Sequence, residues 1–372
     1  MRILICYTSS PGTTGNFIEE ALKQEHEVTF CGTGDSRLFI SGYHGDLDVD
    51  EFAKAMPQYP DLFLYIASAI RCFPKGLERL KCPTAGYLID VHLQAKDLCE
   101  LSRFFDSVLI GHSDYLPLFR NINPNSHWLP VACAPDVHHP VQCVEQYEVG
   151  FVGRSRLKLK GQVPRAYMLK HLSQLFTMND FNRSYGPEEM SLVYGQSKMV
   201  FNYPVNNDLN MRFFEALACQ KLLVTKRIAN GQDTLFREGE HFVAYDGLDD
   251  LVEVVRFYLE HDDERERIAR QGYELVLSKH TYRIRVEEML DMILAEGGRF
   301  SAPIRKIGLT SVATHYMRAY ARRGMVDAVC DVLASGQCTT TLHFLSGNWL
   351  ILKAFLNRTL RVILSTVLRR AV

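Results

Sequence analysis

The chain has 372 residues, of which 47% are hydrophobic and 23% charged, and its formal net charge is −1 at pH 7. Such a composition is typical of a globular protein with a large buried core, and this length allows two or three domains. It excludes a disordered chain, a collagen or a coiled coil as the main architecture, and the balanced charge argues against a strongly basic nucleic-acid-binding protein.

The sequence predicts neither a membrane span nor a secretory signal. No run reaches the roughly 18 apolar residues that a span needs, and the apolar start at Met1–Tyr7 is too short for the core of a signal peptide. The 10 cysteines are scattered without a C-x-x-C pair, which is typical of reduced thiols. We therefore expect a cytoplasmic protein.

The first half of the chain alternates apolar strands with helices. A strand at Arg2–Tyr7, a Gly-containing turn, a helix at Asn16–Gln24 with Asn16 as its N-cap, and a strand at His26–Cys31 form one βαβ unit. A further helix is expected at Leu93–Phe104. Four more strands follow the first two, at Leu62–Ala67, Ala85–Ile89, Ser107–Ile110 and His127–Leu129. This pattern predicts a parallel sheet with both faces covered.

A second series of strands and helices begins after Gln146. Its expected strands are Val149–Val152, Val200–Asn202, Leu222–Thr225 and His241–Ala244. Its expected helices are Arg165–Phe176, Asn210–Cys219, Leu248–His261, Glu264–Lys279 and Tyr282–Glu296. The fold class is therefore α/β, with two Rossmann-like domains, residues 1–142 and 147–299, that face a shared cleft. A helical basic extension, residues 300–372, follows them.

The turn after the first strand is a candidate binding loop. Ser10, Gly12, Thr13 and Gly15 stand between this strand and a helix, and a helix N-terminus offers free N–H groups to an anion. Three interpretations remain open here: a tight turn, a loop that contacts a substrate, and a nicotinamide site. The last is disfavoured because the spacing is not G-x-G-x-x-G and no acid ends the second strand.

Arg212 and Glu215 form the most informative pair in the sequence. They lie three residues apart, on one face of an otherwise apolar helix. A buried carboxylate is costly unless it is paired or hydrogen-bonded, and its two oxygens suit a vicinal diol such as ribose. A guanidinium suits a diphosphate by charge and geometry. The alternative is a plain Arg–Glu ion pair on the helix surface.

Two further features have competing interpretations. Asp48-Val49-Asp50 spells a D-x-D that could hold a metal, but it also stands where acids favour the first turn of a helix, and we prefer that interpretation. Residues 301–372 have 10 basic and 2 acidic side chains, and Leu352–Arg370 has the pattern of an amphipathic basic helix. Such a helix could bind an anionic membrane surface through 349–372, or could pack onto the body or a partner.

The sequence resembles the GT-B glycosyltransferases, and within them the CgeB-like, spore-maturation-type group. Gly150-Phe151-Val152-Gly153 and Leu209–Cys219 carry much of the resemblance. Asp233–Glu240, Ile268–Gly272 and His280-Thr281-Tyr282 with Arg285 complete it in the second half. The first half matches more loosely, at Glu25–Val28, Leu129–Asp136 and His139-Pro140.

This resemblance implies a nucleotide-sugar donor in the second domain, an acceptor against the first, and no cofactor or metal. Glu215 falls on the glutamate that holds the donor ribose, and Arg212 on a diphosphate-side position. Gly153 lies where the backbone passes the phosphates, and Arg154 after it adds charge. Asn210 begins the same helix as the donor-binding pair and is counted with it.

The base that accepts the acceptor's proton is expected at the strand ends of the first domain. Asp90 is our first choice, with His92 and His112 as alternatives. Related retaining enzymes have an acid eight residues before the glutamate, whereas this chain has Asn207 there. This departure leaves the stereochemistry open. It also leaves open a second function, a catalytically inactive GT-B-like binding or scaffold protein. A nicotinamide oxidoreductase is a weaker third.

Overall fold

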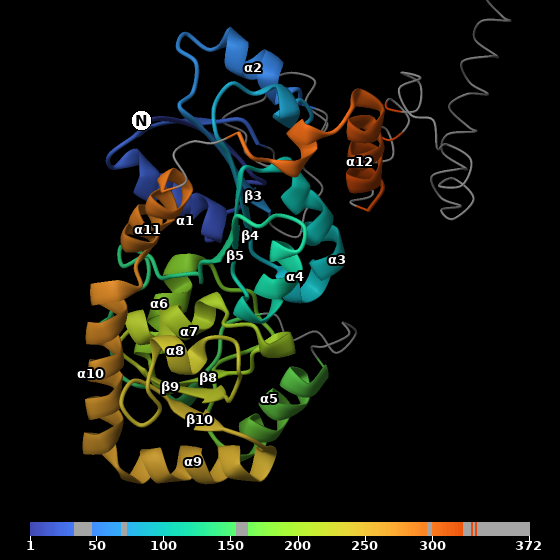
Figure 1. Ribbon diagram of the computed structural model, residues 1–372. Coiled ribbons are helices and arrows are strands. Elements are labelled where there is room, and N and C mark those ends of the chain that lie inside the picture. The colour runs from blue at the N-terminus through green and yellow to red at the C-terminus, as the bar shows by residue number, and fades with distance from the viewer. Residues whose placement is uncertain are drawn as a thin grey trace, which may run out of the picture.

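The computed structural model describes residues 1–32, 47–67, 73–153, 163–295 and 300–322, together with residues 329 and 332. Within them the chain forms two parallel sheets, each covered by helices on both faces (Figure 1). The α/β class and the two Rossmann-like halves expected from the sequence are confirmed. The extension beyond residue 332 lies outside the described residues.

The first sheet has six parallel strands in the order β2-β1-β3-β4-β5-β6. Their bounds are Arg2–Cys6 for β1, Glu27–Phe30 for β2, Leu62–Ala67 for β3, Thr84–Leu88 for β4, Ser107–Ile110 for β5 and Ser126–Trp128 for β6. The helices between them are α1 at Thr14–Lys23, α2 at Val49–Ala55, α3 at Val91–Leu101 and α4 at Leu116–Arg120. The strand β3 is buried along its whole length, as its continuous apolar run predicts.

The second sheet has four parallel strands in the order β10-β9-β8-β7. They are β7 at Tyr147–Gly150, β8 at Ser197–Asn202, β9 at Leu222–Lys226 and β10 at Val243–Tyr245. The helices are α5 at Val163–Leu175, α6 at Pro187–Gly195, α7 at Met211–Ala218, α8 at Gln232–Leu235, α9 at Leu248–Glu260 and α10 at Asp262–Lys279. Of these, α6 and α8 were not predicted from the sequence.

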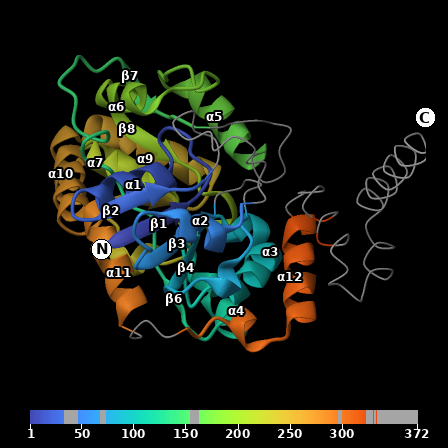
Figure 2. The same cartoon turned by 90° about the horizontal axis from the view of Figure 1, so that it is seen from above.

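The chain returns to the first half after α10. The next helix, α11 at Tyr282–Leu294, packs against α1 and covers one face of the first sheet with Tyr282, Val286 and Met289 (Figures 1 and 2). At this crossing the chain pairs with the segment that joins the two halves. Cys133 N donates to His280 O at 3.0 Å, and Tyr282 N donates to Cys133 O at 2.8 Å. Two chain segments therefore connect the halves side by side.

The described part of the C-terminal extension packs on the opposite face of the first sheet. The helix α12, Leu309–Arg322, lies beside α3 in both views (Figures 1 and 2). It buries Tyr316, Met317 and Tyr320 in the core that contains Phe73 and Phe104. This part of the extension is therefore continuous with the core of the first half.

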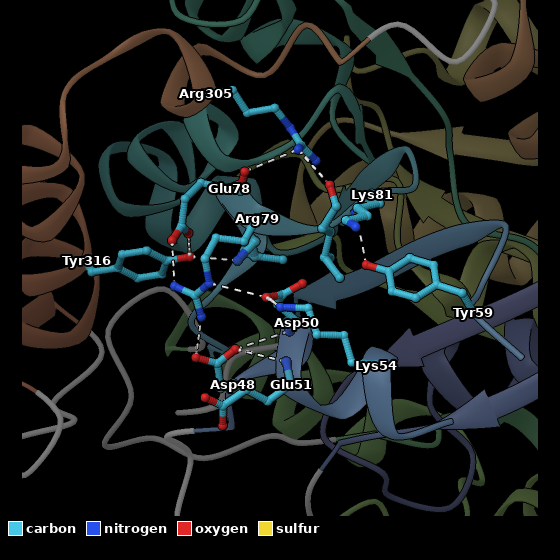
Figure 3. A network of polar contacts seen from close by, with 12 residues as sticks. Asp48, Asp50, Glu51, Lys54, Tyr59, Glu78, Arg79, Lys81, Arg305 and Tyr316 are labelled. Carbon is cyan, nitrogen blue, oxygen red and sulfur yellow. Dashed lines mark hydrogen bonds and ion pairs between the residues drawn. The ribbon is translucent and has the colours of Figure 1, made fainter. Parts of the chain in front are cut away.

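The D-x-D sequence is part of this packing (Figure 3). Asp48 caps α2, since its Oδ1 accepts hydrogen bonds from the backbone N of Asp50 and Glu51, each at 3.2 Å. Arg79 pairs with both Asp48 and Asp50. Beside it, the Tyr316 hydroxyl donates to Glu78 Oε2 at 2.8 Å. The interpretation of this acidic segment as a helix start is confirmed.

Candidate active site

A cavity of about 440 Å³ lies between the two halves. Its first-half wall is formed where β1, β3, β4 and β5 end, at Tyr7, Ile66, Ile89 and Gly111. Its second-half wall is formed by the start of α7 and the segment before it. The carboxyl ends of parallel strands are where open α/β sheets bind ligands. The expected cleft is therefore present.

The cavity brings together most of the residues predicted from the sequence. Those that line it are Gly12, Thr13, Gly15, Asp90, His92, Asn210, Arg212 and Glu215. Ser10, His112 and Gly153 are not among the lining residues. Arg154 lies outside the described residues, so its predicted contribution to the phosphate side stays a prediction.

Glu215 is a buried carboxyl group on the wall of the cavity. The residue is only 8% exposed, and among the described residues no hydrogen bond to its side chain is found. Burial raises the pKa of Glu215 to about 7, and the nearby Arg212 charge opposes this rise. A buried acceptor with no protein donor is a position at which a ligand can donate hydrogen bonds.

A histidine from the segment between the halves faces this carboxyl group. His138 Nε2 lies 3.8 Å from Glu215 Oε1. The backbone N–H of Ala134 donates to His138 Nδ1 at 3.0 Å, so the neutral ring carries its proton on Nε2, the atom turned toward Glu215. Burial lowers the pKa of His138 to about 4, which keeps the ring neutral at pH 7. His138 was not predicted from the sequence.

The Arg212 guanidinium turns away from Glu215 and toward the end of β7. Its Nε donates to Val152 O at 2.9 Å, and its Nη1 donates to Asn202 Oδ1 at 3.0 Å. Its Cζ atom lies 4.4 Å from the centre of the Phe151 ring. The two side chains form no ion pair in the described structure, so the alternative of a plain Arg–Glu pair on the helix surface is wrong. Arg212 is fixed in position by neutral hydrogen-bond partners, and within the described part of the chain it forms no ion pair.

Gly153 lets this guanidinium reach the backbone. Its φ is +152°, and a Cβ atom placed there would lie 2.0 Å from Arg212 Nη2. Any larger residue would therefore displace the guanidinium or the loop. A second arginine, Arg165 of α5, also lines the cavity and is 8% exposed. Its Nε donates to Tyr203 O at 3.2 Å. Two arginines of the second half thus line the cavity.

Asn210 has a structural role at the start of α7. Its side chain accepts a hydrogen bond from Phe213 N, as an N-cap does, and its Nδ2 donates to Asn202 Oδ1 at 3.2 Å. The buried Asn202 thus holds both Asn210 and Arg212. These two contacts of Asn202 were not expected from the sequence, because the segment that contains Asn202 was predicted only as a short apolar strand.

The loop after β1 approaches the second half of the molecule. Gly12 has a φ of +70°, and a Cβ atom there would lie 2.5 Å from Pro187 of α6. Gly15 packs against the Tyr7 ring, where a Cβ atom would meet Cδ2 at 2.3 Å. The predicted N-cap at Asn16 is wrong: α1 begins two residues earlier, after Thr13. Asn16 instead accepts hydrogen bonds from Ser10 N and the Thr13 hydroxyl, and so holds the loop.

The three candidate bases are not equivalent. Asp90 and His92 line the cavity at the end of β4, whereas His112 is buried behind it, with Nε2 at 3.3 Å from Asn206 O. The His92 and His112 ring centres are 5.9 Å apart. Burial lowers the pKa of His92 to about 4 and also lowers that of His112. Within the described residues, Asp90 and His92 are therefore the candidates with access to a substrate.

Sequence reasoning missed Asp208. This residue lines the cavity from the second half, and its Oδ1 lies 3.5 Å from His92 Nδ1. Burial raises the pKa of Asp208 to about 7, the Asp90 charge adds to the rise, and Arg165 opposes it. The family pattern points to position 207, which is Asn207, and Asp208 follows it directly. The adjacent acid was visible in the sequence, but its direction was not, because Asn206 and Asn207 adopt positive φ angles of 54° and 60°.

Comparisons with known proteins bear on the fold and on the family of the second half. Residues 151–291 match the family model described as "Glycosyl transferase-like". The chain is similar to a sucrose-phosphate synthase from Thermosynechococcus elongatus, with 11% identity, a TM-score of 0.55, and coverage of 78% of this chain and 98% of that one. The chain has the GT-B glycosyltransferase fold. The family match and this fold together support a glycosyltransferase.

Two more GT-B structures were determined with nucleotides. HepE of Anabaena, in complex with UDP and glucose, is 12% identical to this chain and has a TM-score of 0.54. The match covers 79% of this chain and 100% of HepE. An alpha-glucosyltransferase, in complex with UDP and a 13-mer DNA, is 13% identical and has a TM-score of 0.55. The match covers 79% of this chain and 99% of the alpha-glucosyltransferase. A comparison with curated protein sequences gives no match. Among the described helices, none is long and apolar enough to cross a membrane.

Proposed function

We propose that this GT-B protein transfers a sugar from a nucleotide-sugar donor to an acceptor hydroxyl. The observation that carries the proposal is the arrangement of Glu215 and Arg212 on one cavity wall. The first is a buried carboxyl group without a hydrogen-bonding protein partner among the described residues. The second is a guanidinium held by neutral partners, with no ion pair among the same residues. A nucleoside diphosphate supplies the complementary groups, a ribose diol and an anionic diphosphate.

The two side chains define the direction in which the donor would lie. Glu215 is placed to accept hydrogen bonds from the ribose hydroxyls, with His138 behind it. Arg212, held against Gly153 and Val152, is placed to bind the diphosphate, with Arg165 on the same side. The sugar would then point toward Asp90 and Asp208. Uridine as the base is favoured by analogy with neighbours that bind UDP.

The proposed reaction needs no metal ion. The leaving diphosphate would be stabilised by the two guanidinium groups, which act on the charge that develops when its bond to the sugar breaks. The D-x-D sequence is engaged with Arg79 and α2 and is not among the residues that line the cavity. In this proposal the cationic side chains of the protein, and not a metal ion, stabilise the leaving diphosphate.

Two finer assignments are also proposals. The resemblance to the CgeB-like group rests on the motifs of the second half, and it would make this chain a member of that group. Peripheral binding to a membrane by a cytoplasmic protein rests on the charge of 349–372, a segment outside the described residues. The acceptor is then a molecule that can reach a cleft held near such a surface.

The alternative function is a protein that binds a nucleotide sugar without turning it over. Asn207, in place of an acid, is the observation that favours this alternative. Asp208 beside it argues for an enzyme, because it places a carboxyl group in the cavity one residue further along. The two functions differ in one measurable step, the breaking of the bond between sugar and diphosphate.

A nucleotide panel tests the proposal. Thermal shift with UDP, GDP, ADP, UDP-glucose and UDP-N-acetylglucosamine should show stabilisation by at least one ligand, since a ligand that binds the native state raises its stability. Release of nucleoside diphosphate from the ligand that binds then distinguishes the enzyme from the binding protein. Gly153→Val, which blocks the place of the Arg212 guanidinium, should abolish the shift. Absence of any shift with the wild-type chain would contradict the proposal.

A further inference from the structure

Asp208 stands at the point where the two halves of the molecule meet. It belongs to the second half, directly before α7, yet it faces residues of the first half across the cavity. His92 Nδ1 lies 3.5 Å from its Oδ1. A carboxyl group of the second half therefore faces a histidine of the first half across the cavity.

The surroundings of Asp208 are those of a proton acceptor. Its side chain is 25% exposed, so one part of it reaches the cavity while the rest is buried. Among the described residues, the charged and titratable groups that face it are Asp90, His92 and Arg165. Burial and the Asp90 charge favour its protonated form, and Arg165 opposes them, so that the pKa of Asp208 is about 7. A base is most effective when its pKa lies near the working pH.

The alternatives from the first half are less suited. Burial keeps His92 neutral, and its Nδ1 atom is buried without a hydrogen-bond partner in the described structure. A neutral ring beside Asp208 can position that carboxyl group, and either tautomer of the ring has a use: Nδ1–H would donate to the carboxylate, and bare Nδ1 would accept from the carboxylic acid. His112 does not line the cavity.

We propose that Asp208 is the base of the transfer reaction, that Asp90 is its charge partner across the cleft, and that His92 positions it. This inference rests on the proposed function. In the step, the O–H bond of the acceptor breaks and its proton passes to a carboxylate oxygen of Asp208. The acceptor oxygen forms a bond to the anomeric carbon. The bond from that carbon to the diphosphate breaks, and its electron pair leaves on the diphosphate oxygen, beside Arg212.

The test measures donor hydrolysis, in which water is the acceptor, so that no acceptor need be known. Asp208→Asn should lower the rate of UDP release from UDP-glucose by at least a hundredfold, the usual contribution of a general base. Asp90→Asn should keep a measurable rate but move the acidic limb of the pH–rate profile to lower pH, because it removes the negative charge that favours the protonated form of Asp208. Asp249→Asn, at an exposed position in α9, is the matched control and should behave as wild type.

The opposite pattern would overturn the inference. If Asp90→Asn abolishes hydrolysis while Asp208→Asn only moves the acidic limb of the pH–rate profile, the base is Asp90. A readout independent of activity is the titration of aspartate carboxyl groups by NMR after ¹³C labelling. One resonance should titrate near neutral pH, disappear in Asp208→Asn and move to lower pH in Asp90→Asn. Its absence from the wild-type protein would also overturn the inference.

Nucleotide binding separates failure of this inference from failure of the proposed function. UDP should bind Asp208→Asn within about threefold of the wild-type affinity, since Asp208 faces the acceptor side. If the wild-type chain binds none of the nucleotides, the proposed function is wrong. The carboxyl titration then decides whether Asp208 and Asp90 are coupled across the cleft.

Discussion

At the scale of single residues, the proposed donor side of the cavity depends on two ionisable groups that form no ion pair within the described structure. Glu215 is buried beside a neutral histidine, and Arg212 is held by a carbonyl, an amide and an aromatic ring. Such an arrangement costs stability in the empty protein, because buried charges and acceptors lack partners. A ligand with a diol and a diphosphate would supply them. The affinity for nucleotide should therefore depend on the protonation of Glu215.

We expect UDP binding to weaken as the pH falls below about 7. The pKa of Glu215 in the empty cavity is raised to about 7 by burial, and ribose hydroxyls donate to the ionised form. That form predominates above pH 7 and is lost below it, so each further pH unit should weaken binding by up to about tenfold. Isothermal titration calorimetry between pH 5.5 and 8.5 measures this dependence.

The control is Glu215→Gln, which keeps the shape but cannot ionise. Since the phosphates of UDP also titrate, the difference between the two pH profiles isolates the carboxyl group. At pH 8, Glu215→Ala should weaken UDP binding by about 1–3 kcal/mol, the cost of leaving buried polar groups unpaired. Identical profiles for wild type and Glu215→Gln would remove Glu215 from the ribose site.

At the scale of elements, the strand β8 positions the helix α7. The Asn202 side chain at the end of β8 is fully buried, accepts hydrogen bonds from Asn210 and Arg212, and donates to Thr225 Oγ1 at 3.1 Å. One amide group therefore connects two strands with the N-terminus of a helix. This connection explains how the guanidinium keeps its direction in an empty cavity.

Asn202→Ala should lower both stability and diphosphate affinity. The loss of a buried hydrogen-bonded amide should reduce the free energy of unfolding by about 1–3 kcal/mol. UDP should lose affinity while uridine, which lacks the diphosphate, should not. Urea unfolding and calorimetry measure the two effects. The control is Thr225→Val, which removes only the partner that accepts a hydrogen bond from Asn202. It should reduce stability and leave UDP affinity within about twofold of wild type. If Asn202→Ala loses affinity for uridine and UDP equally, Asn202 does not position the diphosphate-binding guanidinium.

The helix α2 is stabilised at its N-terminus by an acidic side chain. Asp48 is its N-cap, and such a cap is worth about 0.5–2 kcal/mol. Asp48→Ala should therefore lower the free energy of unfolding by that amount without changing the rate of donor hydrolysis.

Donor hydrolysis should also continue in the presence of the chelator EDTA, because the proposed reaction uses no metal ion. Its loss in EDTA, with recovery on adding manganese, would show that a metal takes part and would return the D-x-D to consideration.

At the scale of the whole molecule, the C-terminal region joins the first half. Tyr316 packs against Phe104 at 4.6 Å between ring centres and receives a hydrogen bond from Leu77 N at 2.9 Å. Arg305 Nη1 donates to Glu78 O at 3.2 Å (Figure 3) and to Leu80 O at 2.8 Å. The first half therefore needs this region to cover its sheet, although the region lies beyond the second half in the sequence.

Truncation should separate this packed region from the basic tail. Removing residues 300–372 uncovers Phe73 and Phe104, so the product should be insoluble or unfold at a markedly lower temperature. Removing residues 333–372 leaves α12 in place and should change the melting temperature by less than about 3 °C. Circular dichroism melts compare the two chains. Equal stability of both truncated chains would show that α12 contributes little to the core.

The basic tail itself should bind anionic membranes. Residues 332–372 have 5 basic and no acidic side chains, and each basic group near such a surface contributes about 1 kcal/mol that salt screens. Sedimentation with phosphatidylserine-containing vesicles should show binding that decreases with salt and is lost on deleting 349–372. Phosphatidylcholine vesicles are the control. Equal binding with and without this segment would contradict the prediction.

The amino-acid sequence by itself determined the α/β class, the two series of strands and the Arg212–Glu215 pair that lines the cavity. Short continuous apolar runs such as Leu62–Ala67 are typical of buried strands in a covered sheet. Arg212 and Glu215 share a face because a helix fixes their spacing. These features depend on local periodicity, which a sequence displays directly. The resemblance carried by the second half added the roles that we propose for the same two residues.

Only the tertiary structure decided which side chains meet across the cleft. His138 faces Glu215, and His92 faces Asp208, although 77 residues separate the first pair along the chain and 116 the second. Their contact depends on how the halves pack and on the positive φ angles that turn the backbone before Asp208. Neither is encoded in a local pattern, because packing is the sum of many distant contacts. The sequence therefore indicated the groups available for chemistry, and the packing of the two halves selected their partners.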